Sequence, residues 1–152
     1  MKQKMAQTTK KNKSEEKLKD FGLGVVSDIQ KHRNPSIDVP IRALSNVSFD
    51  KKSKTIVLGK KMAKRHFFNV AHAKKFLQTV EVASISRGLI QEGKHASLRD
   101  VFYMAKRTIP STNINLVDEQ KESDEVIEDL ELITDNTREQ LNINANKNGS
   151  VS

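Results

Sequence analysis

From about position 69 onward, apolar residues recur at helical spacing, and this periodicity limits the possible folds more than any other feature of the chain. The run NVAHAKKFLQTVEVASISRGLIQEGK predicts a long helix that ends near Gly93. We expect two further helices over about 97–108 and 120–133, and a short one over 136–142. The EGKHA turn joins the first two helices closely, as a helix-turn-helix domain requires.

The predicted helix over 97–108 separates its side chains onto two sides. Ser97 and Asp100 resemble a capping box at its start, and Pro110 marks its stop. Its apolar stripe comprises Leu98, Val101, Phe102 and Ala105. Its basic side carries Arg99, Tyr103, Lys106 and Arg107. The single tyrosine of the chain is therefore predicted to lie among cations, away from the core stripe.

Two interpretations of Tyr103 follow from the residues alone. In the first, the ring stacks on the arginines and caps the edge of the domain. In the second, the side chain is a nucleophile. A phenol with a pKa of about 10 is ionised in about one molecule in a thousand near neutral pH, a handicap of about 4 kcal/mol for direct attack. Neighbouring guanidinium groups favour a phenolate and also bind phosphate, so this spacing would suit a phosphodiester transesterase.

The segment ahead of the helical region is basic and mixed in pattern. Residues 1–16 are rich in Lys, Thr and Ser and are predicted to form a disordered basic arm. A first amphipathic helix is expected over about 15–31. A polar FDKKSK turn predicts a hairpin of two strands over about 38–49 and 54–59, and Pro40 favours an edge position.

Charge is distributed unevenly around a net value of +8. Residues 1–78 carry 19 Lys and Arg against 6 Asp and Glu, whereas residues 112–152 carry 3 against 10. The front of the chain would attract a polyanion, although a basic surface of this kind is as often a solubility device. The run GKKMAKRHFFN over 59–69 is either a surface for a DNA backbone or a solvated turn anchored by its two phenylalanines. For the acidic run DEQKESDEVIEDLE we favour a solvated face over metal ligands.

Several classes of protein are disfavoured by what the sequence lacks. The absence of cysteine excludes a disulfide scaffold, a thiolate metal site and a cysteine nucleophile. The four histidines, His32, His66, His72 and His95, show no metal-ligand spacing. No apolar run has the length of a membrane span, and no signal peptide begins the chain, so we expect a soluble intracellular protein without a membrane partner.

The end of the chain carries an Asn-Gly turn signal at 148–149 with almost no returning strand. We interpret this as a truncated wing, either because the chain is cut from a longer one or because another polypeptide supplies the strand. The predicted organisation is a basic arm over 1–16, an N-terminal extension over 17–68 and a winged-helix domain over 69–152. The predicted fold class is mainly α (α+β), with a winged-helix or helix-turn-helix domain preceded by a helix and a β-hairpin.

Four segments resemble, in order and spacing, the N-terminal half of the A subunit of archaeal type IIB DNA topoisomerase (topoisomerase VI), a family that includes the meiotic enzyme that makes programmed double-strand breaks. They are VPIRALSNVSFD, TIVLGKKMAKRHFFNVAHAKKFLQTVEVA, SLRDVFYMAKRT and DEQKESDEVIEDLE. The resemblance covers about 35–152. It implies a DNA-cleaving winged-helix domain. In the family, a metal-binding Toprim domain follows this domain.

The resemblance also implies roles for individual residues. Tyr103 matches the tyrosine that attacks a DNA phosphodiester and forms a covalent 5′-phosphotyrosyl link. Arg99 matches an arginine that holds the scissile phosphate. Helix geometry, and not the family, suggests Lys106 and Arg107 as contacts to neighbouring phosphates.

The remaining implications concern cofactors and partners. In the family, Mg²⁺ is bound by acidic residues of the Toprim domain, so we assign this chain no metal site and expect the isolated chain to be inactive. ATP is bound by a partner B subunit, two A and two B subunits form a heterotetramer, and the substrate is double-stranded DNA in the cytoplasm, at the nucleoid. We expect residues 1–35 to contact the B subunit. The alternative hypothesis is a non-enzymatic winged-helix DNA-binding protein, and the sequence does not distinguish a truncated subunit from a naturally split one.

Overall fold

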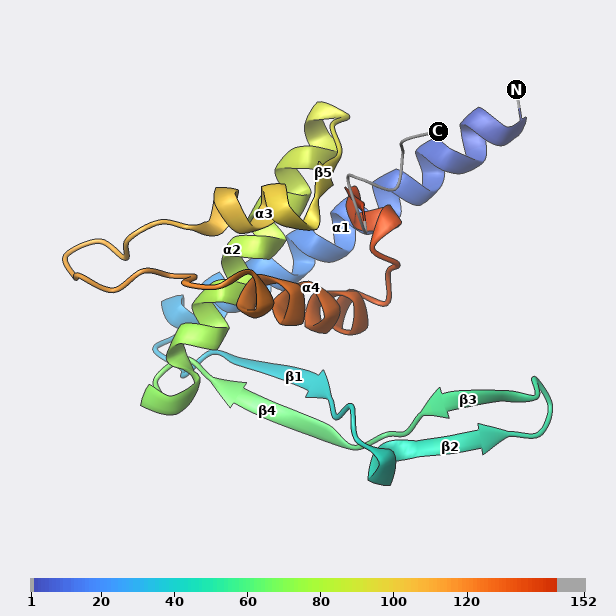
Figure 1. Ribbon diagram of the computed structural model, residues 1–152, viewed down its shortest axis with the longest axis horizontal. Helices are drawn as coiled ribbons and strands as arrows, with labels where there is room; N and C mark the ends of the chain where they lie inside the picture. Colours follow the sequence, from blue (N-terminus) through green and yellow to red (C-terminus); the bar gives the residue numbers. More distant parts are fainter. Residues whose placement is uncertain (1, 145–152) are drawn as a thin grey trace.

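The computed structural model describes residues 2–144, which form a small helical bundle with short strand pairs at its edges (Figure 1). Four α-helices are present in this part of the chain: α1 (Lys2–Gln30), α2 (Val70–Glu92), α3 (Leu98–Ala105) and α4 (Gln120–Thr134). The strands are β1 (Ser36–Pro40), β2 (Val47–Asp50), β3 (Thr55–Leu58), β4 (Met62–His66), β5 (Ala96–Ser97) and β6 (Ile143–Asn144). Two 3₁₀ turns, η1 (Leu44–Asn46) and η2 (Glu139–Leu141), complete the order. The predicted mainly α (α+β) class with a winged-helix-like domain is confirmed.

Local signals account for the bounds of α2. The side-chain oxygen of Asn69 accepts a hydrogen bond from the N–H of Ala71 and caps the first turn. Gly93 ends the helix in the left-handed region, with φ of 68°, and its N–H donates to the carbonyl of Ile90. The predicted long helix that ends near Gly93 is confirmed.

The main core lies where α2, α3 and α4 meet, and α1 packs against α2 (Figure 1). Buried apolar side chains from these helices fill it, among them Leu18, Val82, Ile90, Val101, Val126, Ile127 and Leu130. Of the apolar side chains of α4, Val126, Ile127 and Leu130 are fully buried, whereas Ile133 is only partly buried. Burial of apolar area at about 25 cal/mol per Å² is the main force that holds such a bundle together.

Two antiparallel ladders precede α2. β2 pairs with β3 across the predicted FDKKSK turn, which confirms the hairpin. The first predicted strand, over 38–49, is nevertheless not continuous, because η1 interrupts it. Its first part, β1, pairs with β4 instead, from Ser36 opposite His66 to Pro40 opposite Met62. β1 pairs with β4 because this places Ile37 and Val39, which share the inner face of β1, against Phe76 of α2 in the core.

The prediction of a disordered arm over residues 1–16 is wrong for the described residues 2–16, which are the first turns of α1. Lysine, glutamine, alanine and methionine in this stretch are good helix formers. The helix is also held by tertiary contacts, because the Ser14 hydroxyl is buried and lies 3.2 Å from Oδ1 of Asn136. The helix predicted over 15–31 is thus the second half of a longer one that ends at Gln30.

The C-terminal part differs from the prediction in detail. The helix expected over 136–142 is only the 3₁₀ turn η2. β6 pairs in parallel with β5, with Ala96 opposite Ile143. The predicted Asn148–Gly149 turn lies outside the described residues. None of the helices within 2–144 has the length and apolarity needed to cross a membrane.

Candidate functional site

α3 is a short helix whose inner side fixes the direction of its outer side. Its N-terminus carries the predicted capping box: the Ser97 hydroxyl accepts from the N–H of Asp100, and the Asp100 carboxylate accepts from the N–H of Ser97. Val101 and Ala105 are fully buried and Phe102 nearly so. Leu98 packs against the core from a partly buried position, so the predicted apolar stripe is confirmed. The helix ends at Ala105, earlier than the expected position near 108.

Tyr103 and Arg99 lie together on the outer side of α3. The Tyr103 side chain is 55% exposed, and its hydroxyl oxygen accepts a hydrogen bond of 3.3 Å from Nη2 of Arg99. The Arg99 guanidinium carbon lies 5.6 Å from the centre of the Tyr103 ring. The centres of the Phe102 and Tyr103 rings lie 5.1 Å apart. The tyrosine is therefore held by contacts with a buried ring and a cation, with its oxygen at the surface beside a guanidinium group.

The two other predicted site residues have different surroundings. Nη2 of Arg107 lies 2.6 Å from Oε1 of Glu81 on α2, so part of its charge is matched within the chain. Nζ of Lys106 lies 5.4 Å from the centre of the Phe102 ring. The structure thus brings Arg99 to Tyr103 but pairs Arg107 with a carboxylate that sequence reasoning did not consider.

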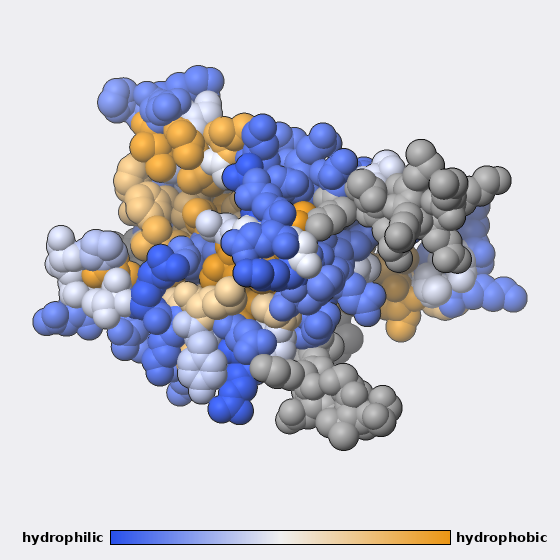
Figure 2. All heavy atoms as spheres, turned by 90° about the horizontal axis from the view of Figure 1, so that it is seen from above, coloured by the Kyte–Doolittle hydropathy of each residue, from blue (hydrophilic) through white to orange (hydrophobic). Residues whose placement is uncertain are grey.

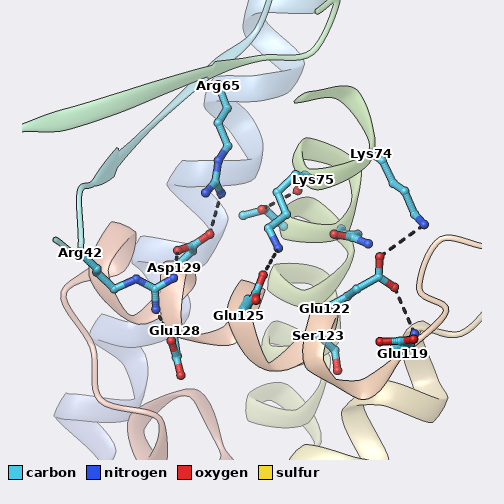
Figure 3. Close-up of polar contacts among 12 residues, drawn as sticks. Arg42, Arg65, Lys74, Lys75, Glu119, Glu122, Ser123, Glu125, Glu128 and Asp129 are labelled. Atoms are coloured by element: carbon cyan, nitrogen blue, oxygen red, sulfur yellow. Dashed lines mark hydrogen bonds and ion pairs between the residues drawn. The ribbon is translucent and has the colours of Figure 1, made fainter. Parts of the chain in front are cut away.

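The acidic face of α4 is not simply solvated, contrary to our expectation, because it is paired with basic side chains of the preceding segments (Figure 3). Arg42 and Arg65 converge on the carboxylate of Asp129, whose side chain is 1% exposed, with N–O distances of 2.7 and 2.6 Å. Arg42 also pairs with Glu128. Long-range pairing of this kind leaves no local pattern, and its only trace in the sequence is the opposite charge of the two ends of the chain.

Two lysines of α2 extend the same pairing toward the N-terminus of α4 (Figure 3). Nζ of Lys74 lies 2.9 Å from Asp118 and 3.4 Å from Glu122, and Nζ of Lys75 lies 3.0 Å from Glu125. The hydrogen bond from Lys74 is the main cause that lowers the pKa of the Asp118 carboxyl, and the bond from Lys75 does the same for the pKa of Glu125. The hydrogen bond to Asp118 in turn raises the pKa of Lys74. These carboxylates are therefore stabilised in their charged form.

The basic and aromatic run over 59–69 divides its residues between two roles. Arg65 is bound to Asp129, and Lys64 lies 3.7 Å from Asp38. Phe67 packs against Phe76, with 5.4 Å between ring centres, and so anchors the segment to the core. Phe68 is 66% exposed and does not anchor it. The interpretation as a turn anchored to the core therefore holds for Phe67. Arg65 fits neither that interpretation nor a DNA-backbone surface, because it is bound to Asp129.

The described residues do not fit a bound metal ion. Within 2–144 no three His, Cys, Asp or Glu side chains converge as ligands would. Nδ1 of His66 and Nδ1 of His72 are buried without a hydrogen-bond partner in the structure, but neither stands beside a second and third ligand.

The fold and the site together define a winged-helix-like domain that presents an arginine-bound tyrosine at its surface. Residues 74–143 match the family model described as type IIB DNA topoisomerase. Over 135 residues the chain is 44% identical to the A subunit of type 2 DNA topoisomerase 6 from Pyrococcus abyssi, and the match covers 89% of this chain and 35% of that protein. The corresponding protein of Saccharolobus shibatae is 35% identical over 143 residues (88% and 37%), and that of Methanocaldococcus jannaschii 31% over 138 residues (90% and 36%).

The chain therefore belongs to the type IIB DNA topoisomerase family. It spans about a third of the length of the curated relatives that it matches, and the three relatives named above are A subunits. The family resemblance predicted from the four sequence segments is confirmed.

Proposed function

We propose that this chain is the DNA-cleaving part of a topoisomerase VI A subunit. The observation that carries the proposal is the hydrogen bond of 3.3 Å between Arg99 and the exposed hydroxyl of Tyr103, on a helix fixed by its cap and its buried side. Family membership supplies the reaction class, because the relatives are named as DNA topoisomerases.

In the proposed step, the Tyr103 oxygen attacks the phosphorus of a DNA phosphodiester. A bond forms between this oxygen and phosphorus, the bond from phosphorus to the 3′-oxygen breaks, and the phenol proton is lost while the 3′-oxygen gains one. The product is a 5′-phosphotyrosyl link with a free 3′-hydroxyl, and the reverse attack reseals the strand without a new energy source. Arg99 would bind the non-bridging oxygens and stabilise the charge that they gain in the transition state.

The rest of the activity requires components that these residues do not supply. We propose that Mg²⁺ is held by acidic residues outside this chain and that ATP is bound by a B subunit. Two A and two B subunits would form the heterotetramer that cuts both strands of a duplex and relaxes supercoiled DNA, at the nucleoid in the cytoplasm. Residues 1–35, which include α1, are the proposed contact with the B subunit.

The test uses the assembled enzyme with supercoiled plasmid, Mg²⁺ and ATP. Tyr103→Phe removes only the attacking oxygen, so we expect loss of both relaxation and the covalent protein–DNA adduct with unchanged DNA affinity. Arg99→Ala should reduce the rate of cleavage by roughly 10²–10³-fold, as expected for the loss of one charge-stabilising donor, and Arg99→Lys should restore only part of it. A covalent adduct that persists in Tyr103→Phe would refute the proposed nucleophile, and binding without an adduct in wild type would favour a non-enzymatic domain.

A further inference from the structure

The β2–β3 hairpin extends beyond the β1–β4 ladder as a two-stranded ribbon (Figure 1). Val47 pairs with Leu58 and Phe49 with Ile56, so all four side chains share one face of the ribbon. These residues are exposed, and Phe49 and Ile56 most of all, at 62% and 74%. Figure 2 shows hydrophobic patches between hydrophilic ones on the face that it draws, and exposed apolar side chains also occur elsewhere, but on the hairpin four of them share one face of a protruding ribbon. A grouped apolar surface of this kind is typical of an interaction site.

The same ribbon carries a cluster of cations at its turn and at its base. Lys51, Lys52 and Lys54 stand in the turn, and Lys60 follows β3. Among the ion pairs of residues 2–144, none includes any of these four lysines, although they do include Arg42, Arg65, Lys74 and Lys75 of the neighbouring segments.

The one acidic residue of the hairpin is committed to the turn itself. The Asp50 carboxylate accepts from the hydroxyl of Ser53 at 2.8 Å and from the N–H of Lys52 at 3.0 Å. The hydrogen bond from Ser53 is the main cause that lowers the pKa of Asp50. Asp50 therefore orders the turn that displays the three lysines.

We propose that the β2–β3 hairpin is a second DNA-binding element, which holds duplex DNA through its turn lysines and lays its apolar face on the groove. A two-stranded ribbon fits a DNA groove, unpaired lysines bind phosphates, and apolar side chains contact bases and sugars there. The charge of the hairpin favours DNA over a protein as its occupant. An apolar protein surface would cover Phe49 and Ile56 only, whereas DNA would also place phosphates beside the unpaired lysines. The inference rests on the proposed function, since it adds a DNA contact to a DNA-cleaving domain.

This contact is separate from the one that Tyr103 would make. α4 packs against α3 on one side and against β1 on another, and the hairpin continues from the β1–β4 ladder (Figure 1). The hairpin therefore stands across α4 from the Tyr103 face. It would bind DNA remote from the scissile phosphate.

The experiment measures binding of a fluorescent DNA duplex by the chain over a range of salt concentrations. The test variant changes the three turn lysines, Lys51, Lys52 and Lys54, to Gln. Its matched control changes Lys19, Lys31 and Lys121 to Gln, which removes the same charge from exposed lysines that form none of the ion pairs within residues 2–144. A third variant, Phe49→Ser with Ile56→Ser, removes the apolar face and leaves the charge unchanged. Thermal melts check that each variant is folded.

We expect the turn variant to lose about tenfold or more in affinity, and its plot of log K against log salt to become shallower by up to about 2.7, at about 0.9 per phosphate contact. The control should keep at least most of its affinity. The apolar variant should lose affinity without a change in slope. An equal loss in the turn variant and the control, or wild-type affinity in the turn variant, would overturn the proposal. Wild-type affinity in the apolar variant would overturn the seating of that face on DNA.

The outcome is distinguishable from a failure of the proposed function. In the assembled enzyme at saturating DNA, the turn variant should form the covalent adduct at the wild-type level, because Tyr103 and Arg99 are intact. Tyr103→Phe should show the reverse, with normal binding and no adduct. If the hairpin is instead covered by a protein, the apolar variant will disrupt formation of the heterotetramer while the turn variant binds DNA as wild type does, and the proposal fails.

Discussion

Replacing Asp129 by Asn should be the most destabilising conservative substitution in the polar network of Figure 3. The Asp129 side chain is 1% exposed and receives both Arg42 and Arg65, so the substitution leaves two guanidinium groups without their shared counter-charge. Removing one partner of a buried ion pair costs about 3–5 kcal/mol. The side chains of Arg42 and Arg65 are 37% and 22% exposed, and water can partly solvate them, which places the expected cost at about 3 kcal/mol.

The assay is thermal and urea denaturation of the chain. A loss of about 3 kcal/mol lowers the melting temperature by about 6–12 °C in a protein of this size. Glu128→Gln is the matched control: Glu128 also binds Arg42, but its side chain is 48% exposed, so we expect a change below about 1 kcal/mol. Replacing Asp129 by Leu together with Arg42→Met and Arg65→Met should recover most of the stability, because no charge is then left buried without a partner. An Asp129→Asn variant within about 0.5 kcal/mol of wild type, the range of ordinary surface substitutions, would refute this reasoning.

Two further predictions concern the cap of α3 and the acid dependence of stability. Ser97→Ala removes the hydroxyl that caps the eight-residue helix α3 and should lower the free energy of unfolding by about 1 kcal/mol. The control Ser84→Ala, at an exposed position of α2, should be neutral. Equal melting temperatures for the two variants would contradict the role of the cap. The pKa values of Asp118 and Glu125 are lowered in the folded state by Lys74 and Lys75, so their stabilising contribution is present above the unfolded pKa of about 4 and is lost as pH falls through the lower folded values. A Lys74→Met, Lys75→Met variant should therefore show a flatter loss of stability on acidification than wild type in denaturant titrations, and an unchanged acid limb would count against these pairs.

Elements with strong local signals were predictable from the sequence. Helical periodicity and a glycine stop indicated the end of α2, and the spacing of Ser97 and Asp100 indicated the start of α3. The length of α1 was not predictable, because its buried Ser14 meets Asn136, 122 positions further along the chain. Likewise, the turn signal near Asp50 indicates β2 and β3 but carries no information on the β1–β4 pairing.

In the candidate site, too, contacts within one helix were predictable and contacts between distant segments were not. Arg99 and Tyr103 are four residues apart on one helix, so helix geometry alone brings them together, and the structure has them in contact. Arg107 is also four residues from Tyr103, but it lies beyond the end of α3 at Ala105, and its guanidinium is bound by Glu81 of α2. A pattern within one helix says which side chains share a face, but a cation's partner comes from the tertiary fold.

This distinction changes how the basic character of the chain is interpreted. The excess of Lys and Arg over residues 1–78 suggested a broad surface for a polyanion, but Arg42, Arg65, Lys74 and Lys75 are held by carboxylates of α4 and of Asp118 just ahead of it. Such cations contribute little to DNA binding, because each phosphate contact would first have to displace a carboxylate. The positive charge available to DNA is then concentrated where the described part of the chain provides no acidic partner, and the turn of the β2–β3 hairpin is such a place. Long-range pairing with α4 and Asp118 thus occupies four cations of the basic segment, and it leaves the unpaired lysines, those of the hairpin turn among them, free to meet a phosphate.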